Sequence, residues 1–338
     1  MKRYGNLFEQ VRGFEPLRRA ALEAAKGKKL KPRVARFLLD LEPEVIALEK
    51  ELIAHTYRPR PYRTFAVSDP KQRMICAADF RDRVVHHAVC EVLEPIFERS
   101  LIGDSYACRK GKGSHAAIHR AQEFMQRFPY YLKLDVRKFF DSVDHGVLKR
   151  QLRCKIKDRD FLWLLDVFID HAVPWAAPGK GIPIGNLTSQ HFANFYLHPL
   201  DHLIKDDLGV KGYIRYMDDM VLFGDTKPEL WQAFSRIAAF LLEVLLLYVK
   251  AGSVTTAPVS EGLSFLGFRI YPGVIRLQRS GWRRFRRKVI GQEERFQAGM
   301  IFEEKLLRSV TSLLGHVRHA NSRNLLASFF AAHQRIDI

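Results

Sequence analysis

The chain has 338 residues, 47% of them hydrophobic, which is enough to bury the core of one large multi-part domain or of two ordinary ones. Its formal net charge is +18 at pH 7, and most of the excess lies at the ends: residues 1–34 carry ten Lys/Arg against three Asp/Glu, and residues 276–338 carry thirteen against five. A near-neutral middle between basic flanks predicts a globular protein that binds a polyanion, and favours nucleic acid over a membrane surface. The alternative is that the basic ends are only solvated helices.

The four cysteines are widely spaced and form no C-x-x-C pair, which argues against a structural zinc site and against a disulfide framework. The N-terminus is charged and has no apolar core of secretory length, and the apolar run at residues 240–249 is too short to span a bilayer. We therefore expect a cytoplasmic protein with reduced thiols and no membrane association.

Helical periodicity dominates residues 14–54, and we interpret residues 1–56 as a basic helical N-terminal extension. Three helix breakers interrupt this stretch: Gly27, Pro32 and Pro43. Residues 57–75 are proline-rich and β-prone, and residues 82–97 place their apolar side chains along one helical stripe.

Two strand-prone segments carry aspartates at their ends. Residues 130–136 are typical of a short buried strand that reaches Asp135 before a basic and aromatic turn. Residues 213–223 form two apolar runs around Asp218 and Asp219, which predicts a hairpin with both carboxylates at its tip. Adjacent carboxylates repel each other and resist desolvation, so a divalent cation is their usual partner, although a polar turn would also explain an isolated pair.

These three aspartates suit magnesium, which binds few carboxylates and completes its shell with waters and substrate phosphates. Three carboxylates from two strands fit a two-metal phosphoryl-transfer site, in which the ions serve the attacking and the leaving oxygen. The spacing in the sequence does not show whether the three side chains meet.

Five motifs occur in order between residues 57 and 270. They are Lys71-x-Arg73, Asp135 with Phe140 five residues on, Gly185-Asn186-Leu187-Thr188-Ser189-Gln190, Tyr216-Met217-Asp218-Asp219, and Phe265-Leu266-Gly267-Phe268. In this order the chain resembles a reverse transcriptase. The resemblance implies an α+β right-hand polymerase, with fingers and an antiparallel palm sheet over residues 57–272 and a basic helical thumb over residues 273–338.

The resemblance assigns catalysis to Asp135, Asp218 and Asp219. It implies two Mg²⁺ ions, replaceable by Mn²⁺ in vitro, held mainly by Asp135 and Asp218, with Asp219 and the Val136 carbonyl as further ligands. Lys250, after the helical run at residues 230–249, stands about where the family's general acid for pyrophosphate is expected. A surface lysine is the alternative for Lys250.

Other residues would bind nucleotide and primer. Lys71 and Arg73 would clamp the triphosphate, a task suited to a point charge and a bidentate fork, unless they are an ordinary solvated strand edge. Phe140 would exclude a ribose 2′-hydroxyl as a steric gate, unless it is a core aromatic. The primer grip would be formed by Phe265, Leu266, Gly267 and Phe268, unless they are a plain turn packed on the palm.

The segment at residues 184–190 narrows the resemblance. Most reverse transcriptases have Gln before the glycine and Pro after the serine, whereas this chain has Ile184 before Gly185 and Gln190 after Ser189. This variant resembles the diversity-generating retroelement subgroup, which copies a template RNA into cDNA with errors opposite adenine. Ile184, Gly185 and Gln190 would then contact the nucleotide, and Ile184 would weaken selection by lacking a polar contact; a core role is the alternative for Ile184.

The thumb would hold nucleic-acid backbones through a basic run of Arg283, Arg284, Arg286, Arg287 and Lys288. The partners implied are template RNA, a DNA or RNA primer, deoxynucleoside triphosphates and a small basic accessory variability protein, in a prokaryotic or phage-encoded system. We expect no RNase H or endonuclease domain in the 338 residues. The alternatives are a retron-, intron- or phage-defence-type reverse transcriptase of ordinary fidelity, or a catalytically silent RNA-binding scaffold.

Overall fold

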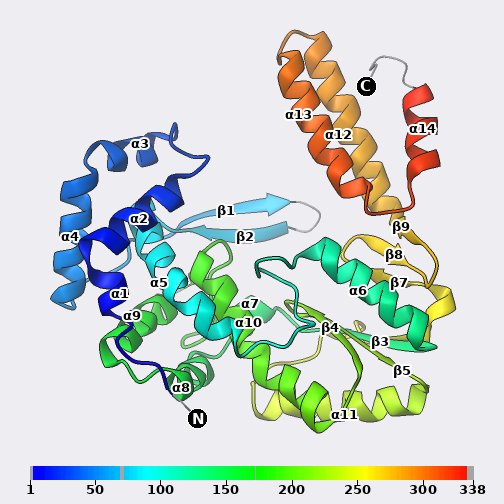
Figure 1. The fold of residues 1–338 in the computed structure, drawn as a ribbon, viewed down its shortest axis with the longest axis horizontal. Coiled ribbons are helices and arrows are strands. Elements are labelled where there is room, and N and C mark those ends of the chain that lie inside the picture. Colours follow the sequence, from blue (N-terminus) through cyan, green and yellow to red (C-terminus); the bar gives the residue numbers. More distant parts are fainter. Residues whose placement is uncertain (1–2, 69–71, 172, 333–338) are drawn as a thin grey trace.

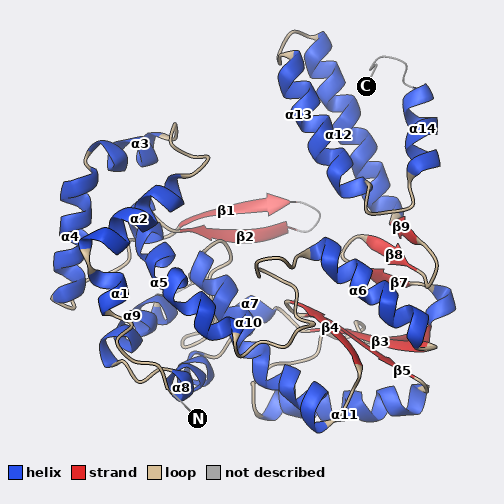
Figure 2. Ribbon diagram, in the orientation of Figure 1, coloured by secondary structure: helices blue, strands red, loops and turns tan. Residues whose placement is uncertain are grey.

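The computed structural model describes residues 3–68, 72–171 and 173–332. Helices at the two ends of the chain flank a central body that holds the strands (Figures 1 and 2). Within the described ranges, no helix is long and apolar enough to cross a membrane.

Four helices form the N-terminal part, as the periodicity of residues 14–54 predicts. They are α1 (Glu9–Arg12), α2 (Phe14–Ala25), α3 (Pro32–Leu39) and α4 (Leu41–Ile53). Helix α2 packs its buried leucine and alanine face against α5 (Phe80–Glu98), which contains the helix expected at residues 82–97. Pro43 does not break a helix: it lies in the first turn of α4, where its missing N–H costs no intrahelical bond, and the break falls at Asp40.

A two-stranded hairpin of β1 (Arg63–Ser68) and β2 (Gln72–Ala77) follows. Its strands are antiparallel, with Ala66 opposite Met74, and β1 is exposed along its whole length. The hairpin therefore projects from the body, as Figure 1 shows, and only the end of β2 near Cys76 is buried.

A four-stranded antiparallel sheet lies at the centre. Its order is β4 (Gly212–Tyr216), β5 (Asp219–Gly224), β3 (Tyr130–Asp135) and β6 (Thr255–Pro258). Side chains alternate between its faces: Tyr131 joins the core beneath α6 (Ser114–Arg127), while Leu132 and Leu134 join the core that includes α11 (Lys227–Glu243). The sheet is thus covered on both faces, and its aspartates lie where strands begin or end.

Four helices lie between β3 and β4 in the chain. They are α7 (Phe139–Ser142), α8 (His145–Lys155), α9 (Arg159–Asp170) and α10 (Leu187–His202), the last continued by a π-helical turn at Leu203–Asp207. The helical run expected at residues 230–249 is too long: α11 ends at Glu243, and Val249 instead forms an antiparallel bridge with Val136. Leu246, with φ 52, turns the chain toward β3, and backbone pairing of Val249 with Val136 takes the place of further helix.

The C-terminal part begins with a small sheet of β7 (Leu263–Phe265), β8 (Phe268–Ile270) and β9 (Ile275–Leu277). Three helices follow: α12 (Arg279–Gln297), α13 (Glu303–Val317) and α14 (Arg323–Ala332). They have a small core of their own, built around Phe285, Val310 and Phe329. The basic run from Arg283 to Lys288 lies within the first of these helices, α12.

Candidate active site

Strand pairing brings the three aspartates to one end of the central sheet. Asp135, the last residue of β3, lies opposite Asp219, the first residue of β5. Tyr216 and Asp219 pair across the β4–β5 hairpin, which leaves Met217 and Asp218 as its two-residue turn. Met217 has φ 53, a left-handed conformation that costs a non-glycine residue about 1–3 kcal/mol and that the surrounding structure must hold in place.

The electrostatics reflect crowded carboxylates. Burial, followed by the negative charge of Asp135, raises the pKa of Asp218 to about 6. Lys250 Nζ lies 3.0 Å from Asp135 Oδ2, and Lys133 Nζ lies 3.0 Å from the Asp219 carboxylate. Two lysines therefore balance part of the negative charge that the sheet brings together.

Lys250 and Val136 both belong to this end of the sheet. The Lys250 amide donates to the Asp135 carbonyl at 2.9 Å, beside the Val136–Val249 bridge. Since successive carbonyls alternate along an extended chain, the Val136 carbonyl points the other way, toward the side on which β5 lies. The Lys250 ammonium contacts Asp135 and its side chain is 44% exposed.

A buried ion pair supports the turn from below. Arg215 and Asp201 are both fully buried, and the guanidinium donates to the two Asp201 oxygens at 2.7 and 2.6 Å. Arg215 also donates to the Met217 carbonyl at 3.3 Å and to Asn194 at 3.2 Å. In the sequence, Arg215 is part of the apolar strand that precedes the aspartates and has no predicted role. A charged residue within an apolar run nevertheless indicates that a buried partner is needed.

The segment at residues 184–190 lies against the base of the β1–β2 hairpin. The Ile184 carbonyl accepts a hydrogen bond of 2.8 Å from the Cys76 amide. Gly185 has φ 120, and a Cβ there would come within 2.9 Å of Ile75 and 3.0 Å of the Cys76 carbonyl, so the close approach requires glycine. The side chains of Ile184 and of Gln190, in the first turn of α10, are half-buried.

The remaining nucleotide candidates are placed as follows. Arg73 is exposed on β2 opposite Val67, while Lys71 lies outside the described residues. Phe140 is half-buried edge-to-face on Phe139 with ring centroids 5.7 Å apart, and its carbonyl accepts from the Ile182 amide at 2.8 Å. Phe140 thus stands next to the segment that leads into Ile184.

The predicted primer-grip residues form the β7–β8 turn. Phe265 and Phe268 are fully buried, so their rings face the core and not a ligand. Leu266 (φ 48) and Gly267 (φ 88) form the turn itself, with both residues in the left-handed conformation of a tight hairpin. The Gly267 carbonyl accepts from the Gln278 amide at 3.1 Å, which ties this turn to the start of α12.

The five basic residues predicted on α12 do not share one face. Arg283, Arg286 and Arg287 are exposed and line a surface groove of about 430 Å³ together with Glu294. Arg284, the next residue along the helix after Arg283, is half-buried toward α13, where burial, followed by the charges of His319 and Arg284, lowers the pKa of His316. Because successive residues are about 100° apart around a helix, Arg284 and Lys288 point away from the three arginines that line the groove.

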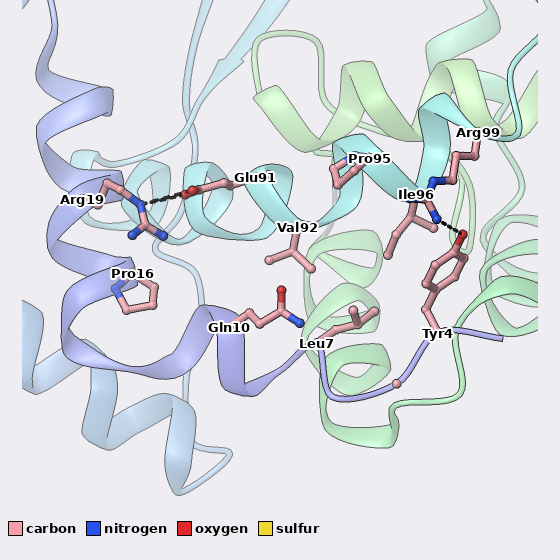
Figure 3. Close-up of a pocket in the computed structure, with 11 residues that line it drawn as sticks. Tyr4, Leu7, Gln10, Pro16, Arg19, Glu91, Val92, Pro95, Ile96 and Arg99 are labelled. Carbon is pink, nitrogen blue, oxygen red and sulfur yellow. Dashed lines mark hydrogen bonds and ion pairs between the residues drawn. The ribbon is translucent and has the colours of Figure 1, made fainter.

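A larger groove of about 590 Å³ lies elsewhere, between the N-terminal helices and α5. Figure 3 shows the Arg19–Glu91 ion pair at one end of it and the hydrogen bond from Arg99 to the Tyr4 hydroxyl at the other. None of the predicted catalytic, nucleotide or primer residues lines it.

Among the described residues, no group of three or more acidic, histidine or cysteine side chains is gathered closely enough to hold a metal ion as it stands. At the aspartates this agrees with the ion pairs to Lys133 and Lys250, which occupy carboxylate oxygens. The donor set nevertheless suits a hard divalent cation, because the raised pKa of Asp218 records burial and carboxylate repulsion that such a cation would relieve.

Comparison with known proteins gives relatives for most of the chain. Protein YkfC of Escherichia coli (strain K12) is 25% identical over 274 residues, which cover 68% of this chain and 72% of YkfC. The group II intron-encoded protein LtrA of Lactococcus lactis subsp. cremoris is 26% identical over 170 residues, 48% of this chain and 28% of LtrA. The putative COX1/OXI3 intron 1 protein of Saccharomyces cerevisiae is 24% identical over 177 residues, 50% of this chain and 21% of that protein. The chain thus spans less than a third of either of these two intron proteins.

Solved structures show the same fold. Telomerase from Candida albicans, solved with a fragment of telomeric RNA, gives a TM-score of 0.51 at 13% identity over 81% of this chain and 55% of that one. Apo telomerase from Candida tropicalis gives 0.50 at 13% identity over 68% and 59%. The predicted α+β right-hand polymerase fold is therefore confirmed.

Residues 68–270 match the family described as reverse transcriptase (RNA-dependent DNA polymerase), and this span contains all three aspartates. Together with the intron-encoded relatives, this match establishes that the chain belongs to the reverse transcriptase family and is of the group II intron-like kind.

Proposed function

We propose that this chain is an RNA-directed DNA polymerase whose catalytic groups are Asp135, Asp218 and Asp219. The observation that carries the proposal is the pairing of Asp135 with Asp219 at the end of β3 and β5, beside the turn that presents Asp218. Strands far apart in sequence thereby bring three carboxylates together within the segment that matches the family.

Asp135 and Asp218 would hold two Mg²⁺ ions, or Mn²⁺ in vitro, with Asp219 and the Val136 carbonyl as further ligands. Bound there, the ions would supply positive charge to the attacking 3′-oxygen and to the leaving pyrophosphate. With its pKa at about 6, the Asp218 carboxyl is mostly ionised at pH 7 and so is available as a ligand.

The other predicted residues take roles that their positions support. Lys250 Nζ, 3.0 Å from Asp135, is the group proposed to give a proton to pyrophosphate. Arg73, with Lys71, would hold the triphosphate, and Phe140 would act as the steric gate beside the segment carrying Ile184. Of the β7–β8 hairpin, the Leu266–Gly267 turn is the part proposed to support the primer, because both phenylalanines are buried.

We place the thumb at residues 273–338, after fingers and palm at residues 57–272 and the extension at residues 1–56. Its exposed Arg283, Arg286 and Arg287 would bind the phosphates of the template RNA and primer. A small basic accessory variability protein and a cytoplasmic setting in a prokaryote or phage host belong to the same proposal and rest on resemblance alone.

Primer extension tests the polymerase assignment. Wild-type protein should extend a DNA primer annealed to RNA with deoxynucleotides and Mg²⁺, and Asp218→Ala should reduce the rate by at least about a thousandfold, because it removes a proposed metal ligand at the reacting centre. Thermal unfolding of both proteins serves as the control for folding. Extension by Asp218→Ala at a rate near wild type would contradict the catalytic role of Asp218, whereas no extension by the wild-type protein would favour a silent RNA-binding scaffold.

We further propose that the polymerase is error-prone and copies RNA in a diversity-generating retroelement. The supporting feature is Ile184, which stands where most of the family has glutamine and whose side chain is half-buried beside Gly185. Losing one polar contact to the nucleotide or template base changes discrimination by about 0.5–1.5 kcal/mol, which is up to roughly tenfold. The second candidate is an intron-type enzyme of ordinary fidelity, which the similarity to the group II intron-encoded protein LtrA favours.

The variant Ile184→Gln distinguishes the error-prone retroelement enzyme from the intron-type enzyme of ordinary fidelity. Under the retroelement proposal it should lower misincorporation opposite template adenine by roughly tenfold, because the restored amide favours the correct pair. Sequencing of cDNA made from one RNA template by wild type and variant measures the change, with errors opposite the other three bases as the internal control. An unchanged error spectrum in the variant would contradict the proposed role of Ile184, and few errors opposite adenine in the wild type would favour ordinary fidelity.

A further inference from the structure

Lys133 lies close to the aspartates, and no role was assigned to it by the family motifs. It lies on β3 two residues before Asp135, so both side chains leave the strand on the same face. Its side chain is only 23% exposed, about half the exposure of Lys250. A lysine is seldom held this far from water unless its ammonium is fully engaged.

Three groups engage the ammonium of Lys133. It lies 3.0 Å from the Asp219 carboxylate, donates to the Ser264 carbonyl at 2.9 Å, and stands 5.5 Å from the centre of the Phe265 ring. Asp219 belongs to the catalytic hairpin, whereas Ser264 and Phe265 are the last residues before the Leu266–Gly267 turn. One side chain thus joins the central sheet to the separate β7–β8–β9 sheet at the site.

Lys250, the other lysine beside the aspartates, does not join the central sheet to the β7–β8–β9 sheet in this way. Lys250 contacts the side chain and backbone of Asp135, within the central sheet and its bridge. Lys133 contacts an aspartate on one side and the hairpin proposed to support the primer on the other. Charge balance alone would need only the first of these contacts.

We propose that Lys133 is a positioning residue that fixes Asp219 relative to the Leu266–Gly267 turn, and thereby aligns the primer 3′-end with the catalytic carboxylates. This inference rests on the proposed polymerase function. A displacement of about 1 Å at a reacting centre can cost a hundredfold in rate, so a link between the two sheets at this point has a measurable consequence.

The test compares Lys133→Met, which keeps the length and apolar stem, with Lys133→Arg, which keeps a cation. Tyr131→Phe is the matched control, because its hydroxyl also joins β3 to the β7 hairpin region, by a 3.1 Å hydrogen bond to the Gly262 carbonyl, but at the end remote from the aspartates. Single-nucleotide addition would be followed at varied deoxynucleotide and primer–template concentrations, together with thermal unfolding of each protein.

Lys133→Met should lower kcat about ten- to hundredfold while the KM for deoxynucleotide and the Kd for primer–template stay within about twofold. Lys133→Arg should recover a large part of kcat, and Tyr131→Phe should keep wild-type kcat. Wild-type kcat in Lys133→Met, or an equal loss in Tyr131→Phe, would overturn the proposal. Failure of wild-type protein itself to extend a primer would instead count against the polymerase function on which the inference rests.

Discussion

At the residue scale, the site depends on charges that the fold forces together and then balances. Asp218 is crowded enough for its pKa to rise to about 6, while Asp135 and Asp219 each have a lysine at 3.0 Å. Beneath them, Arg215 is paired with Asp201 where neither side chain reaches water, and it holds the carbonyl of the strained residue Met217. The geometry of the Met217–Asp218 turn is thus tied to a buried ion pair.

Asp201→Asn tests that dependence. It leaves the Arg215 guanidinium buried without its counter-charge, which should lower the free energy of unfolding by about 3–5 kcal/mol and reduce primer extension. The denaturant midpoint measures the first effect. Glu304→Gln is the control, since it breaks an exposed Arg308–Glu304 pair that should contribute at most about 0.5 kcal/mol. Equal midpoints for the two variants would show that the buried pair does not hold the turn.

At the element scale, α6 meets the end of α13 through histidines. His115 of α6 stacks on His319 with ring centroids 3.5 Å apart, and its Nε2 lies 3.4 Å from Nδ1 of His316. His119 faces the same cluster, and Arg284 of α12 adds a positive charge. Burial, and then the neighbouring cations that would form, lower the pKa of His115 and of His316 below 6.5.

This contact should weaken in acid. Above about pH 6.5 these histidines are neutral in both folded and unfolded chains, so the contact is fully present; as the pH falls through 6.5, the unfolded state takes up protons first and stability is lost. Hydrogen exchange of α13 should therefore quicken between pH 7.5 and 5.5. His115→Phe, which keeps a ring on His319, should reduce that pH dependence, whereas His55→Phe, outside the cluster, should leave it unchanged. A pH dependence that is identical in all three proteins would contradict this account.

At the scale of the whole molecule, the β1–β2 hairpin and the C-terminal helices are arranged around the central sheet that carries the aspartates. The β1–β2 hairpin and the C-terminal helices α12 to α14 both lie above the central sheet in the view of Figure 1, and the three aspartates lie between these two parts in the sequence. The excess positive charge lies mainly at the two chain ends, outside the segment that matches the family. The primer-extension test with Asp218→Ala concerns the whole molecule, because extension would need the proposed fingers, palm and thumb together.

Much of this arrangement was predictable from local patterns. The strands that carry Asp135 and Asp219, the turn at Asp218 and the long helix α5 follow from apolar periodicity and turn residues within a few positions of each other. The end of α11 was placed too late because the apolar residues at 244–249 fit a helix equally well, and only pairing of Val249 with Val136 favours the extended form. The burial of Phe265 and Phe268 likewise depended on neighbours that local pattern cannot specify.

The sequence by itself determined the family, the right-hand fold and the aspartates, since ordered motifs and local periodicity carry that information. Only the tertiary structure decided that Lys133 reaches Ser264, 131 residues away, and that Arg215 has Asp201 as its buried partner. Each of these contacts joins different elements, so its existence depends on how sheets and helices pack. A lysine or an arginine in a strand shows that a partner is needed, while the packed structure selects which one.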